Sequence, residues 1–222
     1  MIDYLSVETI AVTVMGYPMS WIELVGTTCY LASVVLIAKR QMATWPVGIV
    51  AVILYAALFW QIRLYSDALE QAYYLGASVY GWWHWTRMRG DRDQPVPVGY
   101  ASRASIVRTG VLTAVASVVL GAPMTRGHAW LPTPFPAPAA HPGVDAATTV
   151  ASLVAMWLTA RRRVESWVYW IAIDVVGVWL YHVKGVRFVA LLYVVLLALA
   201  VWGLVGWHRC RHRGRRAASR SA

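Results

Sequence analysis

The residues best suited to chemistry lie in one apolar stretch, from Trp167 to Tyr181. On a helix, Trp167, Trp170, Asp174, Gly177 and Tyr181 follow one another at steps of three and four and therefore share one face. An aromatic face attracts a cation by roughly 0.5–2 kcal/mol, and a carboxylate adds to this attraction. The spacing therefore predicts a site for a flat, positively charged heteroaromatic molecule with polar substituents.

Asp174 carries most of this hypothesis. An ionised acid about 10 Å into a membrane helix, at 1.5 Å per residue, costs on the order of 3 kcal/mol and is a functional candidate by default. The alternatives are pairing with a base and protonation, and no Lys or Arg lies centrally in any predicted span. Trp170 lies one turn deeper than Trp167 and is predicted to bind the ligand. Trp167, at the helix start, suits an interfacial anchor and the site equally.

A second group of polar residues follows helical spacing in an earlier apolar segment: Gln71, Tyr74 and Ser78. Gln and Ser inside a membrane either join helices through hydrogen bonds or bind the hydroxyls of a sugar, and both interpretations stay open. Further polar residues lie at the predicted outer ends of their helices: Glu23, Asp145 and Thr149. They suit solvated helix N-caps or an outer vestibule that attracts cations. The run Trp82–Trp85 is interpreted as an aromatic belt at the opposite end.

Motifs for other chemistry are missing from the sequence. It contains no phosphate-binding loop, no nucleophile elbow and no paired carboxylates, so an enzyme is not predicted. Cys29 and Cys210 lack metal-ligand neighbours at useful spacing, and neither a metal nor a cofactor is predicted.

Composition indicates a helical membrane protein. Of 222 residues, 59% are hydrophobic and 14% charged, with a mean hydropathy of +0.52, which leaves too little polar surface for a soluble globule. The net charge of +10 comes from bases in short segments between apolar stretches and in the tail. That placement indicates orientation in a membrane and argues against nucleic-acid binding.

Seven membrane spans of about 20 residues are predicted. They cover about Trp21–Ala38, Trp45–Ile62, Leu69–Thr86, Ile106–Ala122, Asp145–Ala160, Trp167–Val183 and Phe188–His208. An interfacial helix is expected over Met1–Met15, and a helix-free linker over Pro123–Pro142, where Pro132, Pro134, Pro136 and Pro138 cluster. Alternating loops place all but four of the 20 Lys and Arg on one side, the exceptions being Arg63, Arg126, Lys184 and Arg187. The N-terminus is therefore predicted outside and the C-terminus inside.

An internal repeat relates the two ends of the chain. Trp45 and Trp167 are 122 positions apart (167 − 45), and the same offset relates Gly81 to Gly203 and Trp85 to Trp207. Two parallel three-helix units joined by one helix give a 3+1+3 arrangement, with substrate between the repeats. The halves differ around the candidate site, since Gly48, Val52 and Tyr55 stand opposite Trp170, Asp174 and Gly177. The predicted units are 1–20 (interfacial), 21–86 (first repeat), 87–144 (connecting helix and its loops), 145–208 (second repeat) and 209–222 (basic tail).

Several stretches together resemble the PnuC family of vitamin transporters, over nearly the whole chain. They are Ser20–Thr27, Phe59–Tyr65, Gln71, Tyr80–Trp82, Trp85 and Val164–Trp167. The family's Trp-x2-Trp-x3-Asn/Asp pattern is met by Trp167, Trp170 and Asp174. The resemblance implies a SWEET-like fold and facilitated diffusion by alternating access. It also implies nicotinamide riboside as substrate and trapping by a cytoplasmic kinase. Members associated with nicotinamide riboside often have Asn where Asp174 stands, and other relatives carry thiamine.

The sequence thus predicts an all-α uniporter for nicotinamide riboside in a bacterial inner membrane. Thiamine, or another cationic or flat vitamin, is the alternative substrate. A receptor or subunit that does not transport, and a membrane enzyme, are the rival classes. The predicted partners are the small-molecule substrate, the lipid bilayer and, functionally, a kinase, while homo-oligomerisation is left open.

Overall fold

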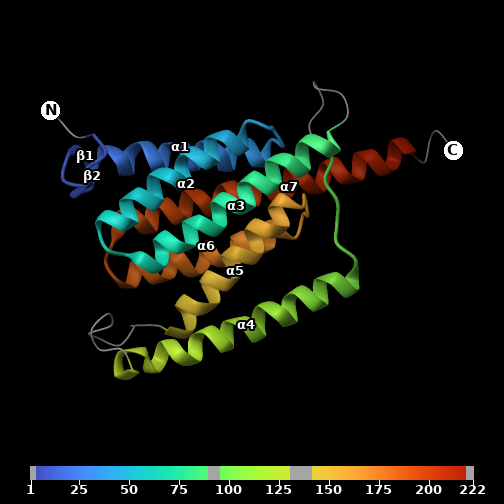
Figure 1. The fold of residues 1–222 in the computed structure, drawn as a ribbon. Coiled ribbons are helices and arrows are strands. Elements are labelled where there is room, and N and C mark those ends of the chain that lie inside the picture. Colours follow the sequence, from blue (N-terminus) through green and yellow to red (C-terminus); the bar gives the residue numbers. More distant parts are fainter. Residues whose placement is uncertain (1–3, 90–95, 131–141, 219–222) are drawn as a thin grey trace.

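The computed structural model describes residues 4–89, 96–130 and 142–218, which form a β-hairpin and seven helices (Figure 1). The strands are β1 (Ile10–Val14) and β2 (Tyr17–Ser20). The helices are α1 (Trp21–Ala38), α2 (Thr44–Gln61), α3 (Tyr65–Met88), α4 (Arg103–Trp130), α5 (Pro142–Ala160), α6 (Ser166–Val183) and α7 (Arg187–Ala218). Each predicted span falls within one helix or differs from it by a residue, because about 20 apolar residues bounded by charged or turn residues specify a membrane helix.

Six of the described helices are long and apolar enough to cross a membrane. The exception is α3, whose first turns contain Asp67, Glu70 and Gln71. These polar side chains lower the hydropathy of a helix that, at 24 residues, is still long enough to span a bilayer.

The expected N-terminal interfacial helix is wrong. Antiparallel strands β1 and β2 pair instead, and Val14 lies opposite Tyr17. Between them Met15 and Gly16 both have positive φ, 51° and 82°, as a two-residue hairpin turn of the primed type requires. The alternation of β-branched Ile10, Val12 and Val14 favours a strand over a helix.

The expected boundary at Pro123 is also wrong, because α4 continues through this proline to Trp130. A proline inside a helix removes one backbone hydrogen bond and kinks the helix, and in membrane helices it is often tolerated. The cluster Pro132–Pro138 lies outside the described residues. At the other end of the chain, α7 extends into the predicted basic tail as far as Ala218.

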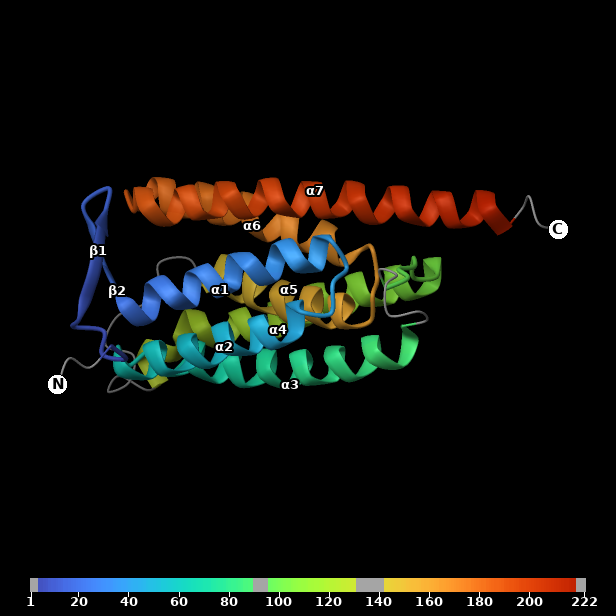
Figure 2. The same ribbon diagram turned by 90° about the horizontal axis from the view of Figure 1, so that it is seen from above.

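Six helices form a ring in which α1 packs on α2 and α7, α2 on α3, α3 on α5, α5 on α6 and α6 on α7 (Figures 1 and 2). Helix α4 packs on α5 from the outside of this ring (Figure 1). Most residues of the apolar span of α4, Arg103–Pro123, are exposed, which suits contact with lipid. The ring encloses the cavity described below.

The sequence repeat is visible in the packing of four tryptophans. The Trp45 ring lies over Gly81 and meets Trp85 edge-on, at 5.1 Å between centroids, and a side chain at Gly81 would overlap that ring. In the second half Trp167 lies over Gly203 and meets Trp207 edge-on at 5.5 Å. Glycine is required at both positions because the indole rings occupy the space of a Cβ.

The two halves also exchange hydrogen bonds at this point. The indole nitrogen of Trp85 donates to the carbonyl oxygen of Ala160, and that of Trp207 donates to the carbonyl oxygen of Ile37, both at 3.1 Å. Helix ends leave carbonyls without intrahelical partners, and these donors satisfy two of them. Trp82 and Trp83 are exposed, as a belt requires, but Trp85 is fully buried, so the belt interpretation is wrong for Trp85.

A short segment, Val96–Tyr100, crosses the same end of the bundle, and we call it the strap. Its Val96 nitrogen donates to the carbonyl of Arg40 at 3.4 Å, and its Gly99 nitrogen donates to that of Arg162 at 3.1 Å. Arg40 and Arg162 occupy matching turns of the two halves, each with φ of 59°. The strap therefore ties the α1–α2 turn to the α5–α6 turn, beside the buried tryptophans.

Candidate functional site

The ring of helices encloses a cavity of about 770 Å³, to which all seven described helices contribute lining residues. Pockets of roughly 300–1,000 Å³ hold drug-sized ligands. At one end the cavity reaches Trp45 and Trp167 of the buried tryptophan cluster. At the other it reaches Asp67, Asp145 and Tyr181.

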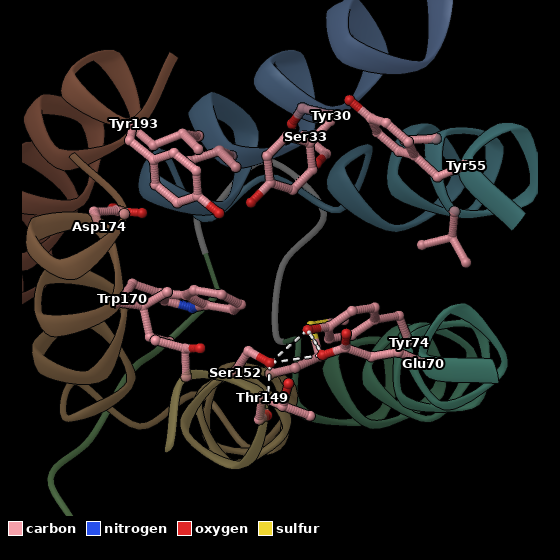
Figure 3. A pocket seen from close by; sticks show the side chains of 18 of the residues that line it. Tyr30, Ser33, Tyr55, Glu70, Tyr74, Thr149, Ser152, Trp170, Asp174 and Tyr193 are labelled. Carbon is pink, nitrogen blue, oxygen red and sulfur yellow. Dashed lines mark hydrogen bonds between the residues drawn. The ribbon is translucent and has the colours of Figure 1, made fainter. Parts of the chain in front are cut away.

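Asp174 faces this cavity from the middle of α6 (Figure 3). It is only 5% exposed. Its carboxylate has no hydrogen bond or ion pair with any residue that the structure describes. A buried charge without a partner is strongly destabilising. A cation that entered the cavity would therefore be stabilised by pairing with this carboxylate.

Trp170 lies one turn before Asp174 and is held in a fixed orientation. Its indole nitrogen donates to the hydroxyl oxygen of Thr159 at 3.2 Å. The Thr159 hydroxyl in turn donates to the carbonyl of Ala155 at 2.8 Å, at the end of α5. Because its polar edge is tied to α5, the ring keeps one orientation against the cavity (Figure 3).

Aromatic side chains continue this wall toward the other end of the cavity. The Tyr193 ring of α7 lies against Gly177, where a Cβ would overlap it. Tyr181 stacks on Tyr193 with centroids 5.4 Å apart and planes 17° apart. Gly177 therefore allows α7 to bring a second aromatic ring close to the face of α6 that carries Asp174.

Across the cavity, α3 and α5 present a polar wall (Figure 3). The hydroxyl of Tyr74 lies 2.8 Å from Oε1 of Glu70 and 2.8 Å from Oγ of Ser152. Oγ of Ser152 also lies 2.8 Å from the same oxygen of Glu70. Gln71 and Ser78, on the same helix as Glu70, are 9% and 2% exposed and line the cavity too.

The charge of the cavity has one sign. Its described lining includes four acids, Asp67, Glu70, Asp145 and Asp174, and no Lys, Arg or His. Clefts lined by one sign of charge and walled by low-dielectric groups concentrate counter-ions. The cavity therefore favours cations and disfavours anions.

All seven residues predicted for the substrate site line this one cavity: Gln71, Tyr74, Ser78, Trp167, Trp170, Asp174 and Tyr181. Trp167 lines it from within the tryptophan cluster, at 2% exposure. Of the three vestibule candidates, Asp145 and Thr149 also line it.

Glu23 has a different setting. It accepts a hydrogen bond from the Tyr17 hydroxyl at 2.7 Å, and its backbone nitrogen donates to the N-cap Ser20 at 3.4 Å. It is not part of the described cavity lining. Burial, followed by the bond to Glu23, raises the pKa of Tyr17 to about 12. Glu23 thus fixes the hairpin to α1, which favours its interpretation as a residue of the helix start.

The sequence reasoning missed several polar or aromatic residues of the site, among them Glu70, Ser152, Thr159 and Tyr193. Two signals point to them. Glu70 precedes Tyr74 by four residues, the spacing at which side chains meet on a helix. Tyr193 occupies the position equivalent to Gln71 in the repeat (193 − 71 = 122). Ser152 and Thr159 give no signal of this kind.

Comparison with known proteins identifies the family. The family model described as "Nicotinamide mononucleotide transporter" matches residues 20–209. The chain belongs to this family. It is 32% identical to "Nicotinamide riboside transporter PnuC" of Escherichia coli (strain K12), over 98% of this chain and 99% of that protein. It is also 32% identical to "Riboflavin/roseoflavin transporter RibM" of Streptomyces davaonensis, over 84% of each.

A solved structure agrees in fold. The "Crystal structure of the Vitamin B3 transporter PnuC" superposes with a TM-score of 0.63 at 24% identity, covering 87% of this chain and 83% of the other. These comparisons confirm the resemblance inferred from the sequence. They also confirm the prediction that the protein is a transporter and not an enzyme. The chain is a multi-pass transporter of the bacterial inner membrane.

Proposed function

We propose that this protein carries nicotinamide riboside across the membrane by facilitated diffusion. The observation that supports this most directly is Asp174, a buried carboxylate without a described partner, beside the fixed ring of Trp170. Nicotinamide riboside combines a flat pyridinium cation with a ribose. The pyridinium would stack on Trp170 and compensate Asp174, since cation–π contact and ion pairing act together there.

The ligands that the relatives' names suggest differ in charge, and the acidic cavity discriminates among them on that basis. A nucleotide bears a phosphate, which would enter a cavity whose described lining has four acids and no base. The flavin ring of riboflavin is flat but neutral, and would leave Asp174 buried without a counter-ion. Thiamine is a flat cation and remains the alternative substrate.

The mechanism and architecture that we propose follow from the repeat. Two three-helix units, α1–α3 and α5–α7, joined by α4 in a 3+1+3 arrangement, would rock against each other and expose the cavity to alternate sides. The N-terminus would lie outside and the basic C-terminus inside. The sequence has no phosphate loop for ATP, so net uptake would depend on phosphorylation of the product by a cytoplasmic kinase.

The test measures binding by the purified full-length protein in detergent, by calorimetric titration with nicotinamide riboside, thiamine and riboflavin. We expect nicotinamide riboside to bind most tightly. Asp174→Ala, which removes the carboxylate, should weaken it by about tenfold or more, in line with 1.5–3 kcal/mol for a charged contact. Trp170→Ala should abolish uptake into proteoliposomes, whereas Trp179→Ala, on an exposed position of the same helix, should leave it intact. Normal uptake by both site variants would overturn the site.

A further inference from the structure

Glu70 is an acid of the described cavity lining, and its carboxylate accepts hydrogen bonds from two other lining side chains, Tyr74 and Ser152. It projects from α3, on the wall that faces Trp170 and Asp174 of α6 (Figure 3). The two carboxylates therefore lie on opposite sides of the cavity. A ligand that reaches both must present a different group to each.

The three oxygens of this cluster share two hydrogens. The hydroxyls of Tyr74 and Ser152 each lie 2.8 Å from Oε1 of Glu70, and 2.8 Å from each other. The Ser152 hydroxyl also lies 2.8 Å from the carbonyl oxygen of Thr149, so its one hydrogen is shared between that carbonyl and Oε1. An ionised carboxylate only accepts hydrogen bonds, so Oε1 takes the Tyr74 hydrogen and competes with Thr149 for that of Ser152. This arrangement fixes the carboxylate and leaves Oε2 without a partner among the described residues.

The free oxygen defines the group that it would take. Because Oε2 only accepts, the ligand atom facing it must carry a hydrogen, on a hydroxyl or an amine. A hydrogen bond to a charged acceptor is roughly twice as strong as a neutral one, and its geometry is set before the ligand arrives. When the cationic ring of a ligand occupies Trp170 and Asp174, the group at Glu70 is the one at the far end of the molecule.

We propose that Glu70 is a specificity-determining residue that binds a ribose hydroxyl of the substrate, with Tyr74 and Ser152 as its positioning residues. The inference rests on the proposed function, and adds to it a second recognition point. The α6 wall would select the flat cation, and the α3–α5 wall would select the sugar.

The experiment compares two ligands that differ only at the far end. Nicotinamide riboside and 1-methylnicotinamide share the same pyridinium carboxamide, but the second has a methyl group in place of the ribose. Both are titrated calorimetrically into the full-length wild type, Glu70→Gln and Glu70→Leu. The two variants lose the same charge, but Gln keeps a polar group and Leu has none. Ser152→Ala, which removes one hydrogen bond to Oε1, is the milder variant.

We expect Glu70→Leu to weaken nicotinamide riboside by about tenfold or more, while 1-methylnicotinamide changes by less than about threefold. The affinities of Glu70→Gln and Ser152→Ala for nicotinamide riboside should lie between those of Glu70→Leu and the wild type. Retained binding of 1-methylnicotinamide shows that each variant is folded with its α6 wall intact.

An equal loss for both ligands would mean that Glu70 acts only as a distant charge, and would overturn the inference. Unchanged riboside binding in Glu70→Leu would overturn it too. If the wild type binds neither pyridinium, the proposed function itself fails, and the inference with it.

Discussion

The two buried tryptophans that join the halves should not contribute equally to stability. Trp85→Phe and Trp207→Phe delete the same indole nitrogen and the same ring volume at two fully buried positions. The difference lies in the acceptors. The Ala160 carbonyl, at the end of α5, accepts only from Trp85 among the described residues. The Ile37 carbonyl accepts from Trp207 and also, at 2.8 Å, from the backbone nitrogen of Arg40.

A buried carbonyl left without a donor costs about 1–3 kcal/mol, whereas losing one of two donors costs about 0.5–1.5 kcal/mol. Because the change in ring volume is the same, Trp85→Phe should destabilise the protein by about 1 kcal/mol more than Trp207→Phe. The free energy of unfolding of the full-length protein is measured by SDS titration in mixed micelles, followed by far-UV circular dichroism. Equal losses, or a larger loss for Trp207→Phe, would refute the reasoning from acceptors.

Two further predictions concern packing and the strap. Gly81→Ala should destabilise the protein by about 1–3 kcal/mol because its methyl group would overlap the Trp45 ring, while Gly76→Ala, in the same helix and with open space around it, should stabilise it by up to about 1 kcal/mol. The same SDS titration measures both, and a destabilising Gly76→Ala would contradict the argument. Arg162→Ala removes a guanidinium that donates at 2.8 Å to the strap, and should speed hydrogen exchange of the strap amides. Arg161→Ala, whose guanidinium lies over the Trp157 ring, is the control and should leave strap exchange unchanged.

Hydropathy determined much of the fold in advance. A run such as Trp21–Ala38 has one stable solution in a bilayer, since its backbone groups must be satisfied internally, and α1 has those bounds. The repeat could be predicted as well, because both Trp45 and Gly81 recur at the same offset in the sequence, as Trp167 and Gly203. The repeat alone could not show why these residues recur together. The reason is that each indole ring contacts a glycine on another helix.

The errors arose where local sequence competes with context. The hairpin depends on two consecutive residues with positive φ, Met15 and Gly16, and methionine gives no signal for that conformation. Proline at position 123 predicts a helix end from its local effect alone, although a long apolar helix tolerates one missing hydrogen bond. Glu70 was missed because its importance comes from Ser152, 82 positions away, and no spacing in the sequence brings the two together.

The two halves of the sequence repeat match where they contact each other and differ where they line the cavity. The residues that tie the halves together match across the repeat, as Trp85 and Trp207 do. The residues that face the cavity do not match, since Asp174 stands opposite Val52, Trp170 opposite Gly48 and Glu70 opposite Leu192. A symmetric cavity would bind a symmetric ligand or water. If Asp174 on α6 binds the cation and Glu70 on α3 binds the hydroxyl, as proposed above, the cavity would admit its ligand in one orientation, with the charged ring toward the second repeat.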